Sequence, residues 1–104
     1  MFEFLKNIFS SNNDALKKIV NEDAFLVDVR SQGEYLSGHA KGSANIPLDQ
    51  IKSQIAKFKG KNNIVVFCRS GMRSSQAKSI LEQNGFTNVI NGGTWNKIDQ
   101  LLNK

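Results

Sequence analysis

The chain has one cysteine, Cys68, and it lies in a short segment rich in arginine, serine and glycine. This cysteine directly follows the apolar run Ile64-Val65-Val66-Phe67 and precedes Arg69-Ser70-Gly71-Met72-Arg73-Ser74. A strand predicted over residues 64–67 therefore delivers the thiol to a loop from which a helix begins. The loop amides, the positive N-terminus of that helix and two guanidinium groups would stabilise a thiolate, a persulfide or a bound oxyanion.

The residue types in this loop favour a reactive thiol over a buried structural cysteine. A free thiol titrates near a pH of about 8.5, and each of these groups favours its anion. We expect Gly71 to adopt a backbone angle that other residues resist, so that several N–H groups converge on the sulfur. Ser70 and Ser74 can add hydroxyl donors, and Ser74 is also predicted to cap the helix.

The other residues that could support cysteine chemistry are few. His39 is the only histidine; it could act as a base in a Cys–His hydrolase, although a loop histidine that bonds the backbone is favoured. One cysteine and one histidine do not make a zinc site, and a second cysteine for dithiol exchange is absent. The sequence therefore predicts no metal and no organic cofactor.

Length and charge indicate a single domain over residues 1–104. The net charge is +5, but the lysines are scattered, so we expect no nucleic-acid partner. Two of the three arginines, Arg69 and Arg73, lie in the cysteine loop, where planar donors suit an oxyanion. No apolar run is long enough to span a membrane. A lone cysteine gives no reason to expect an oxidising compartment, and we expect a cytoplasmic protein.

Residues 1–12 form an apolar N-terminal extension to a core predicted over residues 13–104. Phe2, Leu5 and Phe9 could share one helical face. We expect this segment to cover the protein's own core, with a membrane surface or a partner as the alternative. It lacks the basic start and the cleavage site of a signal peptide.

Strand and helix patterns alternate along the rest of the chain. Strands are predicted over 25–29, 44–46, 64–67 and 87–90, and helices after residues 12–14 and over 31–36, 48–58, 74–84 and 95–102. Asn91-Gly92-Gly93 is predicted to be a turn. Continuous apolar strands alternating with helices indicate an α/β fold with a mostly parallel sheet covered on both faces. Ligands bind beyond the carboxyl ends of such strands, where Cys68 lies.

Ordered motifs from about Ala24 to Leu102 resemble the small, single-domain rhodanese-like sulfurtransferases. They are Leu26-Val27-Asp28-Val29-Arg30, Glu34-Tyr35, Gly38-His39, Gly42-Ser43-Ala44-Asn45-Ile46-Pro47-Leu48, the loop Cys68 to Ser74, and Asn91-Gly92-Gly93 with Trp95. The resemblance implies the rhodanese-like three-layer fold. It also implies a reaction in which Cys68 takes the outer sulfur of thiosulfate or a similar anion and passes it to cyanide or a thiol, including the thiol of a sulfur-accepting protein.

The resemblance also implies a role for each loop residue. Cys68 would be the nucleophile, and the amides of Ser70, Gly71, Met72 and Arg73 would cradle the terminal persulfide sulfur. Arg69 and Arg73 would attract the anionic donor. Asp28 and Arg30 match positions that look structural, and we expect Arg30 to pair with Glu34.

Two other functions fit the same residues. One is a small phosphatase, because related folds use a His-Cys-x-x-x-x-x-Arg loop. Here four residues separate Cys68 from Arg73, Phe67 replaces the histidine, and the shorter loop suits one sulfur atom better than a phosphate. The other is a non-catalytic persulfide carrier or interaction module on the same fold, which the sequence does not separate from an enzyme.

Overall fold

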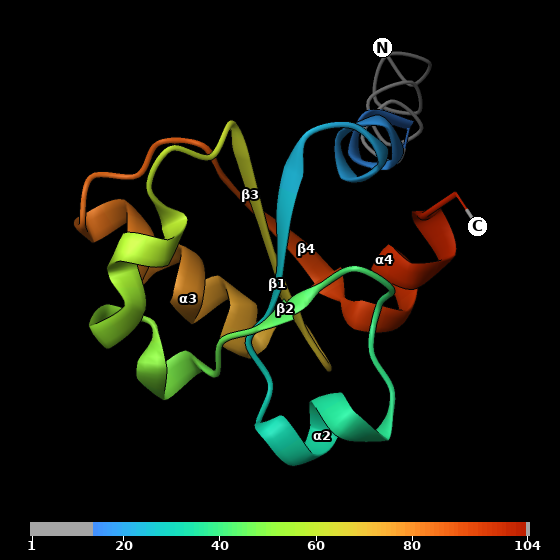
Figure 1. Ribbon diagram of the computed structural model, residues 1–104, viewed down its shortest axis with the longest axis horizontal. Coiled ribbons are helices and arrows are strands. Elements are labelled where there is room, and N and C mark those ends of the chain that lie inside the picture. Colours follow the sequence, from blue (N-terminus) through green and yellow to red (C-terminus); the bar gives the residue numbers. More distant parts are fainter. Residues whose placement is uncertain (1–13, 104) are drawn as a thin grey trace, which may run out of the picture.

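The computed structural model describes residues 14–103, whose strands form one four-stranded sheet. The strands are β1 (Ala24–Asp28), β2 (Ala44–Asn45), β3 (Asn63–Cys68) and β4 (Val89–Thr94). Every neighbouring pair is parallel, and the order is β2-β1-β3-β4 (Figure 1). The predicted parallel sheet is confirmed, whereas the extension predicted over residues 1–12 lies outside the described residues.

Both faces of the sheet are covered, so the molecule has three layers. Successive side chains of β3 enter two different buried clusters: Ile64, Val66 and Cys68 on one face, Val65 and Phe67 on the other. Helix α3 (Met72–Gln83) covers the first face; helix α4 (Trp95–Leu101) and the helical residues 14–21 cover the second (Figure 1). Because neighbouring side chains of a strand point to opposite faces and both faces are covered, β3 is apolar and buried from Ile64 to Cys68.

Helix α2 (Gln32–Ser37) lies beyond the carboxyl end of β1 (Figure 1). Ser31 is its N-cap: the hydroxyl accepts the Glu34 N–H, and the Glu34 carboxylate accepts the Ser31 N–H. This reciprocal capping box, predicted from the sequence, satisfies amides that the helix cannot pair internally. It also fixes the Glu34 carboxylate at the edge of the sheet where β3 ends.

The helix predicted over residues 48–58 is wrong in type. The segment forms two 3₁₀ helices, η1 (Leu48–Gln50) and η2 (Lys52–Phe58). Gln54 leaves the helical region, with φ −116° and ψ 26°, so no continuous α-helix runs through it. Ile51 and Phe58 are fully buried, and their packing into the core holds this irregular segment in place.

The turn predicted at Asn91-Gly92-Gly93 is also wrong, because β4 runs through these residues. Val66 pairs with Asn91 but Phe67 pairs with Gly93, so Gly92 is an extra residue in a β-bulge. A Cβ on Gly92 would lie 2.8 Å from the Ile98 side chain, and Gly93 has φ +84°. Gly92 is thus required by close packing against Ile98, and Gly93 by the positive φ that follows the bulge.

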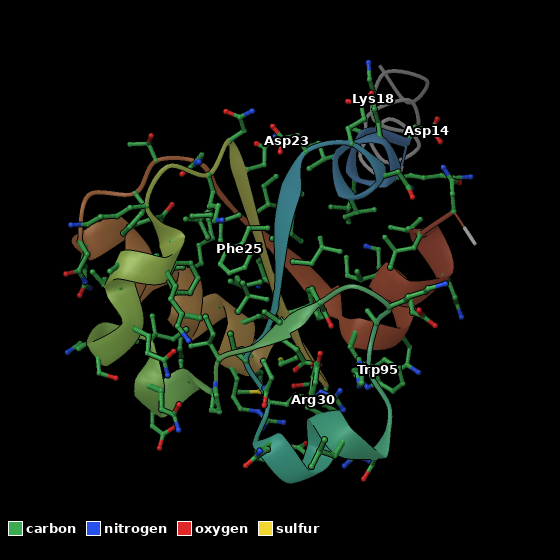
Figure 2. The ribbon with its side chains drawn as sticks, in the orientation of Figure 1. Asp14, Lys18, Asp23, Phe25, Arg30 and Trp95 are labelled. Atoms are coloured by element: carbon green, nitrogen blue, oxygen red, sulfur yellow. The ribbon has the colours of Figure 1, made fainter. Side chains whose placement is uncertain are left out.

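The ion pair predicted between Arg30 and Glu34 does not form. Arg30 instead binds the buried Asp28 carboxylate through Nε and Nη2, at 2.7–3.0 Å. It also donates to the Gly38 carbonyl at 2.6 Å and lies 4.7 Å from the centre of the Trp95 ring (Figure 2). Residues two apart in an extended segment share one face, which brings Arg30 to Asp28.

Among residues 14–103, no helix combines the length and the apolar character that a membrane span requires.

Removing the Arg30 side chain is expected to destabilise the fold. Arg30→Ala leaves the Asp28 carboxylate buried without its cation and should cost about 3 kcal/mol of unfolding free energy. Arg69→Ala, at an exposed position, should change it by less than about 0.5 kcal/mol. Urea unfolding followed by circular dichroism measures both. Equal losses for the two variants would contradict a structural role for the buried pair.

Candidate active site

The site is built around the Cys68 sulfur at the carboxyl end of β3. Cys68 is the last residue of that strand, and its side chain is fully buried in the cluster under α3. Burial alone would suit an inert core cysteine. The groups that face the sulfur are polar, however, and they determine its chemistry.

Gly71 directs its backbone N–H at the sulfur. Its φ of +95° confirms the predicted left-handed conformation, and it is the N-cap of α3. In this conformation the amide donates a hydrogen bond of 2.9 Å to the Cys68 Sγ. The sulfur therefore lies at the N-terminus of a twelve-residue helix, whose dipole favours negative charge.

These contacts lower the pKa of the Cys68 thiol. Burial acts in the opposite direction and raises the pKa, because it penalises the thiolate. Hydrogen bonds from the Ser74 hydroxyl and from the amides of Ser74, Ser70 and Gly71 outweigh that effect. The thiolate is thus favoured by directed donors in spite of its burial.

Ser74 does not cap α3 as predicted; it lies inside the first turn and is fully buried. Its Oγ is 3.6 Å from the Cys68 Sγ, 3.1 Å from the Gly71 carbonyl and 2.7 Å from the Asn91 Oδ1. The sequence did not identify Asn91 as part of the site. The bulge in β4 brings it there, and no local sequence signal reports such a contact.

The other predicted loop residues lie at the surface above the sulfur. Arg69, Ser70 and Met72 are exposed, Met72 at 72%. The Ser70 hydroxyl accepts the Met72 N–H at 3.5 Å, so Ser70 serves the sulfur through its amide and not, as expected, through its hydroxyl. These three residues are thus the exposed part of the loop that follows the buried sulfur.

The two loop arginines differ in their surroundings. Arg73 binds the Glu34 carboxylate with both terminal nitrogens, at 2.6 and 3.0 Å. Arg69 makes no ion pair or hydrogen bond through its side chain with the rest of the described chain. The charge of Arg73 is therefore largely balanced by Glu34, whereas that of Arg69 is not balanced by any ion pair within residues 14–103.

The Glu34–Arg73 pair also shifts the acidity of Glu34. Hydrogen bonds from Arg73 lower the pKa of Glu34 to about 2, although burial opposes them, and bonds from Ser31 add to the lowering. Glu34 was expected to pair with Arg30. It instead joins the capping box of α2 to the cysteine loop.

His39 belongs to a separate contact. Its ring is stacked on Tyr35 with centroids 3.8 Å apart, and its Nδ1 lies 2.8 Å from the Tyr35 carbonyl. This agrees with the favoured prediction of a loop histidine bonded to the backbone. Across residues 14–103, no cluster of three or more potential protein ligands could hold a metal ion.

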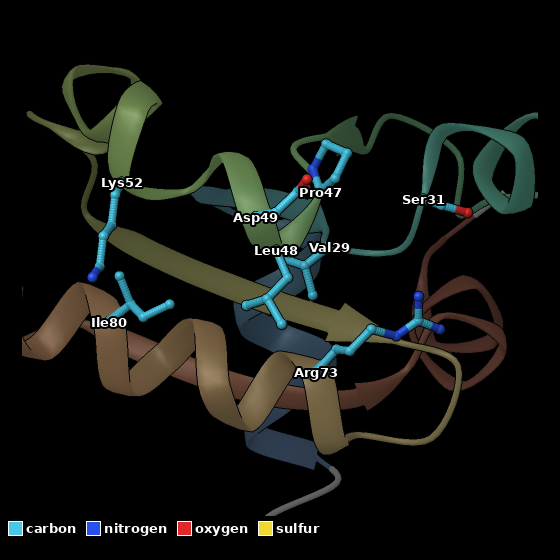
Figure 3. A pocket seen from close by; sticks show the side chains of 8 residues that line it. All are labelled: Val29, Ser31, Pro47, Leu48, Asp49, Lys52, Arg73 and Ile80. Atoms are coloured by element: carbon cyan, nitrogen blue, oxygen red, sulfur yellow. The ribbon is translucent and has the colours of Figure 1, made fainter.

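A groove of about 520 Å³ flanks the loop. It is lined by Val29, Ser31, Pro47, Leu48, Asp49, Lys52, Arg73 and Ile80. Figure 3 shows Lys52 and Ile80 at one end and Arg73 and Ser31 at the other. Cys68 is not part of this lining, so Arg73 is the side chain that the groove shares with the cysteine loop.

The chain is similar to proteins of one family. A rhodanese-like domain model matches residues 11–96. The protein named thiosulfate sulfurtransferase PspE, from Escherichia coli (strain K12), is 44% identical over 69 residues, covering 64% of this chain and 66% of that protein. The putative sulfur carrier protein YrkF of Bacillus subtilis (strain 168) is 34% identical over 80 residues, covering 75% of this chain and 43% of that protein.

A solved structure described as "rhodanese with anions from E. coli" has the same fold. It is 37% identical, with a TM-score of 0.65, and the match covers 71% of this chain and 89% of that one. The curated relatives are longer than the segment they share with this chain, which spans about two thirds of the E. coli protein and less than half of the B. subtilis one.

Gly71→Ala tests whether the directed amide controls the thiol. The left-handed conformation costs an alanine about 1–2 kcal/mol of stability, and the Gly71 N–H would turn from the sulfur, so the pKa of Cys68 should rise. Thiolate absorbance measured across a pH range reports this directly, because Cys68 is the only cysteine.

Gly85→Ala is the matched control. Gly85 has φ +93° with open space around it, so the strain is the same but the sulfur is not involved. It should lose similar stability without a change in the pKa of Cys68. A rise in both variants would show that general loosening, and not the Gly71 amide, sets the acidity.

Glu34→Gln should remove part of the acid sensitivity of the fold while a glutamine keeps the capping box. The paired carboxylate stabilises the native state above its ordinary pKa of 4.5, and this contribution is lost as the pH falls from 4.5 to about 2. We expect less than about 1 kcal/mol, because the pair is partly exposed.

Urea midpoints of both proteins, measured through this pH range, check the expectation. The stability difference between wild type and variant should shrink as the pH falls. A difference that stays constant with pH would contradict the assigned pairing.

Proposed function

Because the chain belongs to the rhodanese-like domain family, we propose that it is a sulfurtransferase that carries a sulfane sulfur on Cys68. The donor is a small anion such as thiosulfate, and the acceptor is cyanide or a thiol, including the thiol of a sulfur-accepting protein. The observation that carries this proposal is the hydrogen bond from the Gly71 amide to the Cys68 sulfur at the N-terminus of α3. It favours a nucleophilic thiolate there.

The proposed reaction has two displacements at sulfur. The Cys68 thiolate attacks the outer sulfur of thiosulfate; the new S–S bond forms as the old one breaks, and sulfite leaves with the electron pair. The acceptor then attacks the terminal sulfur of the persulfide, and the thiolate of Cys68 is regenerated. Negative charge moves only from the Cys68 Sγ to the adjoining terminal sulfur and back, so fixed donors beside both atoms can stabilise every state.

Each loop residue has a proposed part in these steps. The amides of Ser70, Gly71, Met72 and Arg73 cradle the terminal sulfur. They lie in the first turn of α3 or directly before it, where N–H groups have no partner within the helix. No metal or organic cofactor is needed.

In this proposal Arg69 supplies the positive charge that binds the anionic sulfur donor. Arg69 is exposed and unpaired within residues 14–103, so its planar donors are open to the oxygens of an anion. Arg73 is held by Glu34 and contributes less attraction, while it keeps the loop in place. The names of the relatives support an anionic donor: one is a thiosulfate sulfurtransferase and one is a rhodanese with anions.

A phosphatase fits the site less well. Phosphate would need the guanidinium of Arg73 for its oxygens, but that group already binds Glu34. The loop of four residues between Cys68 and Arg73 offers room for one sulfur atom more readily than for a tetrahedral anion.

A persulfide carrier is the second candidate. The relative named as a putative sulfur carrier supports it, and so does the full burial of Cys68, which would protect a stored sulfur from solvent. The two functions share the persulfide and differ in turnover. For either one, a lone free thiol fits a reducing compartment, and the cytoplasm is the location we propose.

Intact mass spectrometry after incubation with thiosulfate tests the proposal. We expect a gain of one sulfur atom per chain, reversed by cyanide and absent in Cys68→Ala. Persulfide formation with negligible steady-state turnover would favour the carrier. The proposal would be wrong, and the phosphatase favoured, if no sulfane donor added sulfur to the protein and the protein hydrolysed an aryl phosphate.

A further inference from the structure

The Ser74 hydroxyl has more acceptors than it can serve. It has one hydrogen, but three groups that can accept it lie around the Oγ: the Cys68 Sγ, the Gly71 carbonyl and the Asn91 Oδ1. The shortest distance, 2.7 Å, is to Asn91. The hydroxyl can therefore stabilise the sulfur only when it is donated to neither oxygen, and the Asn91 Oδ1 is the nearer competitor.

The Asn91 side chain is held so that its oxygen faces Ser74. Its Oδ1 also accepts the Gly93 N–H at 3.0 Å, and its Nδ2 donates to the Gly71 carbonyl at 3.3 Å. These two bonds distinguish the oxygen from the nitrogen of the amide. The bulge at Gly92 sets this position, because it is where β4 changes register against β3.

Two hydrogen-bond arrangements follow from this geometry. With Cys68 protonated, the S–H donates to the Ser74 Oγ and the Ser74 hydrogen goes to the Asn91 Oδ1. With Cys68 ionised, the sulfur needs a donor, and the Ser74 hydroxyl turns to it. The Asn91 oxygen keeps the Gly93 amide, so it is not left unsatisfied.

We propose that Asn91 is a positioning residue that holds the Ser74 hydroxyl in the thiol state and releases it to the sulfur when Cys68 becomes an anion. The hydrogen bonds of Asn91 go to Ser74, Gly71 and Gly93 and not to the sulfur, so it acts through Ser74. Its place in catalysis rests on the proposed function. The exchange of the hydroxyl between two acceptors rests on the hydrogen-bond geometry alone.

Most charged groups around Cys68 are held in ion pairs, so they do not mask the effect of the Ser74 hydroxyl on the titration of Cys68. Arg73 of α3 binds Glu34 of α2, and Arg30 binds Asp28 beside the end of β1. Arg69, next to Cys68, is the unpaired cation among the described neighbours. None of these side chains hydrogen-bonds Ser74 or Asn91, so substitutions at the latter two leave the charges unchanged.

The test is a double-mutant cycle read by thiolate absorbance of Cys68 against pH. Asn91→Ala removes the nearer of the two oxygens that compete with the sulfur and should lower the titration midpoint by roughly half a pH unit, about a threefold change in the acid dissociation constant. Ser74→Ala removes the donor and should raise the midpoint. The double variant should match Ser74→Ala, because Asn91 has nothing left to hold.

Two further variants serve as controls for the cycle. Asn88→Ala removes an asparagine directly before β4, whose side chain donates to the Lys61 and Asn62 carbonyls, and should leave the midpoint unchanged. Asn91→Asp keeps an acceptor facing Ser74 and adds negative charge, so it should raise the midpoint by more in the protein with Ser74 than in a Ser74→Ala background. This last variant keeps the proposal testable if Asn91→Ala does not fold.

A merely structural Asn91 gives a different pattern. Its loss would loosen the Gly71 loop, raise the midpoint, and add to the effect of Ser74→Ala. An unchanged or raised midpoint in Asn91→Ala, or effects that sum in the double variant, would overturn the proposal. The titration uses no sulfur donor, so a failure here is distinct from the absence of a persulfide in the mass measurement.

Discussion

The buried Cys68 sulfur, at the end of a central strand, must be surrounded by hydrogen-bond donors if it is to carry negative charge. Cys68 is enclosed by the core, where an unsatisfied charge would be costly. The compensation comes from the start of α3, where Gly71 turns its amide to the sulfur and Ser74 brings a hydroxyl. The chain passes from β3 to α3 in three residues. The positive φ of Gly71 lets it do so while the Gly71 N–H points back to the Cys68 sulfur at the end of the strand.

The three arginines of the chain have three different surroundings. Arg30 is buried with Asp28 and ties the end of β1 to the Gly38 segment and to Trp95. Arg73 joins the cysteine loop to the capping box of α2 through Glu34. Arg69 is the one arginine that is exposed and has no ion pair within residues 14–103. The same residue type thus braces the site in two places and leaves a third guanidinium open at the surface.

The sequence predicted what depends on near neighbours in the chain. Cys68 and Gly71 are three residues apart, so the strand, the loop and the helix start sufficed to place the amide at the sulfur. Asn91 and Glu34 contact Ser74 and Arg73 across 17 and 39 residues, and those contacts depend on strand register and on the bulge. Asn91-Gly92-Gly93 has the composition of a turn, so the sequence alone predicts one. These residues lie in β4 instead, and Gly92 is a glycine because it packs closely against Ile98.

In the proposed function, the loop after Cys68 holds one transferred sulfur with its backbone amides. A crystal structure of the protein after treatment with thiosulfate would show whether it does. We predict one additional atom bonded to the Cys68 Sγ and enclosed by the N–H groups of residues 70–73. An additional atom that points away from these amides, or an unmodified Cys68 with sulfur elsewhere in the molecule, would contradict the account.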